Sequence, residues 1–119
     1  MATRSTIALE FADGTVQQVY CHWDGYLENN GQILHEHYRD PFKVQRLIDN
    51  GAISSLKPEI GEKHDFDKGH DGWTTFYGRD RGEERQEAKW CTHKHYFHGA
   101  FNWSDYFYLY DEANQEWID

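Results

Sequence analysis

Cysteine, proline, methionine and long apolar runs are all scarce in this chain of 119 residues, which contains two Cys, two Pro and one Met. The two cysteines, Cys21 and Cys91, form no Cys-x-x-Cys motif, which predicts free thiols in a reducing compartment, with a single bridge between them as the alternative. No apolar run reaches the length that spans a membrane, and no secretory signal pattern is present. We therefore expect a cytoplasmic protein without membrane contact.

Positive charge is also scarce, because 12 Lys and Arg face 21 Asp and Glu, for a net charge of −9. This balance repels a nucleic acid backbone and argues against direct nucleic acid binding. No Lys or Arg follows Lys94, so the end of the chain predicts an acidic surface. Such a surface serves solubility or imitates the charge of DNA. Elsewhere acids and bases alternate, whereas duplex mimicry needs a long face of one sign.

Aromatic residues are abundant at 17%, although apolar residues in total reach only 38%. Tyr and Trp supply large buried areas while keeping a polar tip on a partner, which favours a packed sheet over a Leu-rich bundle. The length suits one domain covering residues 1–119, and we find no repeat or linker.

The first half of the chain predicts a hairpin followed by two helices. Residues 4–11 and 15–23 alternate as strands, and Ala12-Asp13-Gly14 fits a bulged three-residue turn. The register that sorts polar from apolar faces pairs Ser5 with Cys21, Thr6 with Tyr20, Ile7 with Val19 and Arg4 with His22.

A helix is expected over residues 26–38, where mostly apolar residues recur at helical spacing. The next helix begins at the N-cap Asp40 and Pro41 and ends before Gly51. Its core-facing residues are expected to be Phe42, Val44, Leu47 and Ile48, with Ile53 and Leu56 buried in a connector.

The second half predicts a long loop over residues 57–73, which is broken by Pro58 and three glycines. Strands are expected at 74–78, 87–98, 106–110 and 116–118, with a turn at 79–82. The fold class is therefore α+β, with an antiparallel sheet of hairpins and two helices packed on one side.

The first candidate site is a polar sheet face. In the expected register its members are neighbours: Arg4, Thr6, Tyr20, His22 and Asp24. An arginine among aromatic rings suits a small anionic, nucleotide-like ligand, because the guanidinium donates two parallel hydrogen bonds to a phosphate and the rings stack on a base. The alternative is that Arg4 pairs with Asp24 and that the other residues are ordinary half-buried sheet residues.

The second candidate is the glycine-bracketed basic segment Tyr77-Gly78-Arg79-Asp80-Arg81-Gly82. Its glycines let the backbone approach an anion, so Tyr77, Arg79 and Arg81 are candidate ligand-binding residues. The alternative is a turn in which Asp80 neutralises its neighbours. If this segment folds toward Arg4, the two sets form one anion pocket.

Metal and nucleophile signals are weaker. Cys91, His93 and His95 alternate as strand ligands would, but a second ligand pair is missing, so we expect neither a metal site nor a cofactor. Cys21 beside His22 suggests a nucleophile and base, yet adjacent strand residues point to opposite faces. We therefore expect no catalytic residues.

Several segments together resemble a family of small bacteriophage and prophage proteins. They are Arg4-Ser5-Thr6-Ile7-Ala8, Tyr20-Cys21-His22-Trp23-Asp24-Gly25-Tyr26, Asn30-Gly31-x-Ile33-Leu34 and Tyr77-x-Arg79-Asp80-Arg81-Gly82. The resemblance implies an accessory protein made in the cytoplasm of an infected bacterial cell. The Cys91/His93/His95 run lies outside the shared pattern.

The leading hypothesis is a non-catalytic, anti-defence binding protein. It would sequester a small anionic nucleotide signal, or it would cover a host defence protein with an acidic, aromatic surface. The alternative is a small enzyme that acts on a nucleotide. A homo-oligomer is also expected to be possible for a small domain so rich in aromatic residues.

Overall fold

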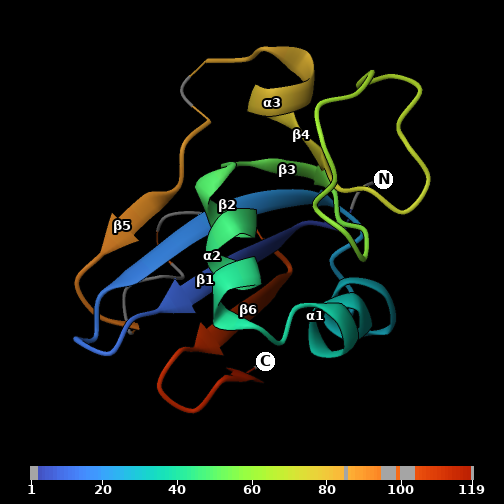
Figure 1. Cartoon of the computed structure of the whole chain (residues 1–119). Coiled ribbons are helices and arrows are strands. Elements are labelled where there is room, and N and C mark those ends of the chain that lie inside the picture. The colour runs from blue at the N-terminus through green and yellow to red at the C-terminus, as the bar shows by residue number, and fades with distance from the viewer. Residues whose placement is uncertain (1–2, 85, 95–98, 100–103, 119) are drawn as a thin grey trace.

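The computed structural model describes residues 3–84, 86–94, 99 and 104–118. Within these residues, seven strands form one mixed sheet with helices beside it, so the fold is α+β (Figure 1). The helices α1 and α2 lie on the same face of the sheet, where the main apolar core is found. The short helix α3 lies beyond the end of strand β4.

The first hairpin has the predicted register. Strand β1 (Ser5–Glu10) pairs antiparallel with β2 (Val16–Trp23), and Ile7 lies opposite Val19. The turn is closed by a hydrogen bond of 2.8 Å from the Phe11 N–H to the Thr15 carbonyl. Gly14 takes a left-handed φ of +91°, as a bulged three-residue turn requires. The face-sorting argument from sequence is therefore confirmed for this hairpin.

The expected purely antiparallel sheet is wrong. The strand order is β4-β3-β2-β1-β6-β7, with β5 paired to the first half of β2. Strand β3 (Ile53–Ser55) runs parallel to β2, and β6 (Tyr106–Asp111) runs parallel to β1. Parallel pairing needs a long crossover, which the two helices supply between β2 and β3. Alternation of apolar residues marks a strand but carries no information on its direction.

The predicted helix over residues 26–38 is shorter and divided. A π-helical turn, η1 (Leu27–Gly31), leads into α1 (Gln32–His37). Three aromatic side chains of the sheet hold the backbone around this segment. Tyr108 Oη donates to the Gly25 carbonyl at 2.6 Å, and Trp117 Nε1 donates to the Tyr38 carbonyl at 2.8 Å. Tyr110 Oη donates to the Arg39 carbonyl at 2.6 Å.

Helix α2 (Pro41–Asp49) begins as predicted, because the Asp40 carboxylate accepts the Phe42 N–H at 3.0 Å. Gly51 follows its C-cap, which was also expected. Three of its four predicted core residues are buried, namely Val44, Leu47 and Ile48. Phe42 is the error, since it is 80% exposed. At 100° per residue, Phe42 lies on the opposite side of the helix from Val44, Leu47 and Ile48, so it faces away from the core.

Residues 57–73 form a loop that contains no named helix or strand in this fully described range, only a bridge between Glu59 and Trp73. Ile53 and Leu56 are buried as expected, although Ile53 belongs to strand β3 rather than to a connector. In Figure 1 this loop lies to one side of β4.

The predicted strand over residues 74–78 is only partly correct. Strand β4 (Thr75–Phe76) is short, and Tyr77 already begins the helix α3 (Tyr77–Arg81). The basic segment is therefore helical rather than a turn. Asp80 accepts the Phe76 N–H at 2.8 Å, which holds the start of this helix and explains why it forms.

Strand β5 (Lys89–Cys91) is shorter than predicted, and residues 95–98 of the expected strand lie outside the described residues. The final hairpin is confirmed, because β6 pairs antiparallel with β7 (Glu116–Ile118). The core face of the sheet carries the odd-numbered residues of β1, including Ile7 and Leu9, packed against both helices. The opposite face is polar at one end and is the location of the candidate site.

Candidate functional site

The strand order brings polar residues of β2 and β3 together with Arg4, directly before β1, and Tyr77, directly after β4, on the face opposite α2. Cys21 is level with Ile53 on β3, and Ile53 is level with Phe76 on β4, and these three side chains enter the core. Because side chains alternate along a strand, His22 and Ser54 project from the other face. Tyr77, at the start of α3, lies near Ser54 and Tyr20. Arg4 lies at the start of β1, beside the end of β2. We call Arg4, Tyr20, His22 and Tyr77 the polar face.

Arg4, Tyr20 and His22 form a connected group, as the sequence predicts. The Tyr20 hydroxyl and His22 Nδ1 lie 2.5 Å apart. The Arg4 guanidinium lies close enough to Tyr20 for its charge to act on that hydroxyl. Burial raises the pKa of Tyr20, while the nearby Arg4 charge acts in the opposite direction. Burial and the Arg4 charge both lower the pKa of His22, so this imidazole is neutral at pH 7.

Tyr77 joins this group from the far side of β3. Burial raises its pKa, and the nearby Ser54 side chain acts in the opposite direction. It also lies close enough to Tyr20 for its charge to raise the pKa of that residue. The Tyr77 N–H bonds the Ala52 carbonyl at 3.2 Å, which anchors the start of α3 to β3. The two candidate sites predicted from sequence therefore meet through Tyr77.

Two predicted members of the site are placed differently. Thr6 is completely buried, and its hydroxyl lies 2.9 Å from the hydroxyl of Ser104, so it is not open to a ligand. Asp24 is half-buried, and its carbonyl accepts hydrogen bonds from the backbone of Asn30 and the side chain of Asn29. Its structural contribution is to shape the turn into η1. The alternative pairing of Arg4 with Asp24 is not found among the described ion pairs.

Arg79 has a structural role instead of an open one. Its Nε and one terminal nitrogen donate to both carboxylate oxygens of Asp80 at 3.0 and 3.1 Å. The other donors reach three backbone carbonyls, those of Ile60, Gly61 and Thr74, at 2.9–3.1 Å. Since a guanidinium has five N–H groups, these five bonds leave no donor for a ligand. The sequence alternative, that Asp80 neutralises a neighbouring arginine, is found for Arg79.

Asp80 completes this arrangement, which we call the Arg79–Asp80 clasp. Burial would raise the pKa of Asp80, but hydrogen bonds from Arg79 and from the N–H groups of Phe76 and His64 outweigh it, and the net pKa is lowered. His64 is held a second time, because its Nε2 lies 3.0 Å from the Thr75 hydroxyl. The clasp therefore ties the loop of residues 57–73 to the start of α3.

Arg81 is the open arginine of the segment. Its side chain is 54% exposed, and Nε lies 3.5 Å from a carboxylate oxygen of Glu83. Its guanidinium also lies over the ring of Phe66, at 4.9 Å from the centroid. Phe66 in turn lies 5.5 Å from the Tyr77 ring. Sequence reasoning did not select Phe66, although a single aromatic between two aspartates in a polar loop is an unusual residue there.

Both cysteines carry free thiols, and Cys21 does not form a nucleophilic site. Cys21 is fully buried, its thiol donates to the Trp23 carbonyl at 3.2 Å, and burial raises its pKa to about 12. Its polar neighbour is Asn30, whose side chain also contacts Ser5, so His22 on the other face does not activate it. A thiol with this pKa is protonated at neutral pH.

The predicted metal motif is only partly described. Strand β5 ends at Cys91, so Cys91 and His93 do not alternate along one strand, and the Cys91 thiol donates to the His93 carbonyl at 3.3 Å. His95 lies outside the described residues. Among the described residues, no group of three or more metal-binding side chains comes together.

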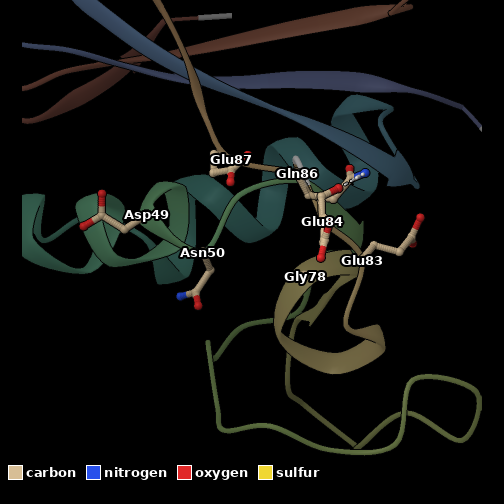
Figure 2. A pocket seen from close by; sticks show the side chains of 7 residues that line it. All are labelled: Asp49, Asn50, Gly78, Glu83, Glu84, Gln86 and Glu87. Atoms are coloured by element: carbon tan, nitrogen blue, oxygen red, sulfur yellow. Dashed lines mark hydrogen bonds between the residues drawn. The ribbon is translucent and has the colours of Figure 1, made fainter.

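A hollow of about 380 Å³ lies between the end of α2 and the segment after α3 (Figure 2). Its rim is acidic because four carboxylates line it, namely Asp49, Glu83, Glu84 and Glu87. The other lining residues are Asn50, Gly78 and Gln86. An anion is repelled here, so this hollow is not the site that the sequence predicted.

Comparison with protein families, with curated proteins and with solved structures finds no match to this chain. In the described part of the chain, none of the helices has the length and apolar character needed to cross a bilayer.

Proposed function

We propose that this chain is a non-catalytic binding protein that holds a small anionic, nucleotide-like ligand on the polar face. The observation that supports this proposal is the connected group of Arg4, Tyr20 and His22, with Tyr77 beside it. Arg4 is exposed and supplies a permanent charge, and the hydroxyl and imidazole supply hydrogen bonds. A phosphate group can accept from Arg4 and from one member of the Tyr20–His22 pair, because their mutual hydrogen bond uses one of the two protons that the pair holds.

The surroundings favour binding over chemistry. The buried Cys21 thiol is held protonated, and the Arg79–Asp80 pair is occupied by structural contacts. Neutral His22 is a possible proton acceptor, but its Nδ1 already contacts Tyr20 rather than a nucleophile. General base catalysis needs a nucleophile within hydrogen-bonding reach of the base.

In biological terms, we propose an accessory protein of phage origin that acts in the cytoplasm of an infected bacterium. By sequestering a nucleotide signal, it would counter a host defence. The resemblance of the segments around Arg4, Tyr20–Tyr26 and Tyr77–Gly82 to small phage proteins supports this context. The polar face draws on all three segments, which ties the resemblance to the proposed site.

The test incubates the purified protein with AMP, cyclic AMP, ADP and cyclic dinucleotides, and then separates and denatures the protein. We expect an intact nucleotide to be released, at a yield that Arg4→Ala lowers. Release of an altered nucleotide would instead identify an enzyme. No retained nucleotide, with calorimetry also showing no binding, would overturn the proposal.

A second candidate function is the covering of a host protein. The supporting observation is that three large apolar side chains shortly after His22 in the chain are exposed, namely Trp23, Tyr26 and Leu27. The Trp23 ring packs edge-on against His22, with 4.9 Å between centroids. Large exposed apolar side chains close together are typical of protein interfaces. Leu27→Ala should weaken such an interaction while leaving nucleotide binding intact, because Leu27 is exposed and the ring that packs against His22 is that of Trp23.

A further inference from the structure

The loop of residues 57–73 delivers one aromatic side chain to the edge of the polar face. Phe66 lies 5.5 Å from Tyr77, and the two ring planes are tilted by 40°. The guanidinium of Arg81 lies over the Phe66 ring, 4.9 Å from the ring centroid. Tyr77, Phe66 and Arg81 therefore form a stack of neighbouring π systems, which we call the aromatic stack. Its outer member is the exposed arginine.

The aromatic stack is assembled from two segments that the clasp holds together. Arg79 bonds the carbonyls of Ile60 and Gly61, ahead of Phe66 in the loop, and Asp80 accepts the N–H of His64. These bonds are made from the same helix that carries Arg81. The position of Phe66 under Arg81 is therefore set before a ligand arrives, which lowers the ordering cost of binding.

We infer that Arg81, backed by Phe66 and Tyr77, stacks against the base of a purine nucleotide whose phosphate lies at Arg4, Tyr20 and His22. This inference rests on the proposed function and assigns Arg81 to the base rather than to the phosphate. Bases stack on arginine planes as well as on aromatic rings. Arg81 lies on the loop side of the polar face, and Arg4 lies on the β1 side.

The separation of the two ends fits a ligand with both a phosphate and a base. Tyr77 follows β4, and Tyr20 belongs to β2, with β3 between them. Two strand spacings amount to about 10 Å. A phosphate ion alone does not bridge this distance, whereas a nucleotide places its base well away from its phosphate. Ser54, between the two ends, offers a hydroxyl to the sugar.

Charges near Arg81 do not block this arrangement. Its ion pair with Glu83 is exposed, with 3.5 Å between the atoms, and exposed pairs of this kind contribute little. A carboxylate lies near each arginine, since Asp105 accepts the Arg4 backbone N–H at 3.3 Å and Glu83 lies beside Arg81. The rings of Phe66 and Tyr77, which lie beside Arg81, therefore favour the base at that end and leave the phosphate to Arg4.

The experiment measures AMP and ribose 5-phosphate binding by calorimetry for the full chain and its Arg81→Lys variant. Lysine keeps the charge but loses the planar group that stacks. We expect the AMP affinity to fall about tenfold, because stacking of one base contributes on the order of 1–3 kcal/mol. Ribose 5-phosphate, which has no base, should bind both proteins equally. Arg46→Lys, on α2, is the matched control and should change neither affinity.

A second variant, Phe66→Leu, keeps an apolar side chain but removes the ring under Arg81. It should weaken AMP binding several-fold and leave ribose 5-phosphate binding unaffected, with thermal unfolding confirming that it folds.

Equal losses for both ligands in Arg81→Lys would make Arg81 a phosphate contact and overturn the inference while leaving the proposed function intact. Unchanged AMP affinity in both variants would also overturn the inference and leave the proposed function intact. If the unaltered protein binds AMP no better than ribose 5-phosphate, the inference is overturned; if it binds neither these nor any other nucleotide, the proposed function fails as well.

Discussion

Arg79 and Arg81 stand two positions apart on one short helix, yet they belong to different regions of the molecule. Arg79 makes five hydrogen bonds within the clasp and lies over the Phe76 ring at 4.6 Å. Arg81 has one exposed ion pair and one aromatic contact. The clasp joins a loop to the sheet, whereas the polar face and the aromatic stack leave charge open to solvent.

The comparison teaches that charge type and spacing do not assign a role to an arginine. A helix turns by about 100° per residue, so Arg79 and Arg81 project in very different directions. Arg79 points toward the Asp80 carboxylate and three backbone carbonyls, whereas Arg81 points toward solvent. The difference between a structural arginine and a candidate ligand arginine is therefore the number of protein acceptors within reach.

The largest expected effect comes from removing the clasp. Arg79→Ala leaves Asp80 as a buried carboxylate without its charged partner, which costs about 3–5 kcal/mol of unfolding free energy. Urea denaturation followed by circular dichroism measures this loss. Arg81→Ala is the matched control and should change the unfolding free energy by less than about 1 kcal/mol. Similar losses for the two variants would remove the distinction between the regions.

A smaller effect is expected at the polar face, and on binding rather than on stability. Arg4→Ala removes the permanent charge, so the affinity for AMP should fall about tenfold, since a charged hydrogen bond contributes roughly 1.5–3 kcal/mol. The unfolding free energy should change by no more than about 0.5 kcal/mol, because Arg4 is exposed. Arg46→Ala serves as the control in calorimetry. A large stability loss in Arg4→Ala would place Arg4 among the structural arginines.

The two regions should also respond to acid differently. The pKa of Asp80 is lower in the folded state than in the unfolded chain, because its hydrogen bonds outweigh burial. Its stabilising contribution is therefore complete above the unfolded pKa of about 3.9 and is lost as the pH falls through the lower folded value. Urea titrations between pH 5 and pH 2 should show this loss, and Asp80→Asn should lack it.

The smallest effect concerns His22, whose pKa is lowered in the folded state by burial and by Arg4. The unfolded chain then binds the proton more readily, so stability falls as the pH drops through the unfolded value of about 6.5. Unfolding titrations from pH 8 to pH 5 should show a shallow decline that His22→Gln removes. His35→Gln, in α1, should keep the decline, and a flat profile in the unaltered protein would contradict the assignment.

Local rules were enough for the elements whose contacts are close in sequence. The first hairpin follows from the turn Ala12–Gly14 and from side-chain alternation, and α2 follows from Asp40 and Pro41. The grouping of Arg4, Tyr20 and His22 follows from the same register, because a hairpin places its cross-strand neighbours by counting from the turn. The amino-acid sequence by itself therefore determines these parts of the fold and of the candidate site.

Contacts between distant segments decided the rest. The parallel pairing of β1 with β6 depends on where the end of the chain packs. The different roles of Arg79 and Arg81 and the contact of Phe66 with Tyr77 depend on where the loop of residues 57–73 packs. Phe42 is apolar but lies about 160° around α2 from Val44, on the face of Gln45 and Arg46, so helical spacing itself accounts for its exposure and only its apolar character suggested burial. Sequence patterns carry local backbone preferences. Which carbonyl or ring an arginine meets is decided by packing between segments far apart in the chain.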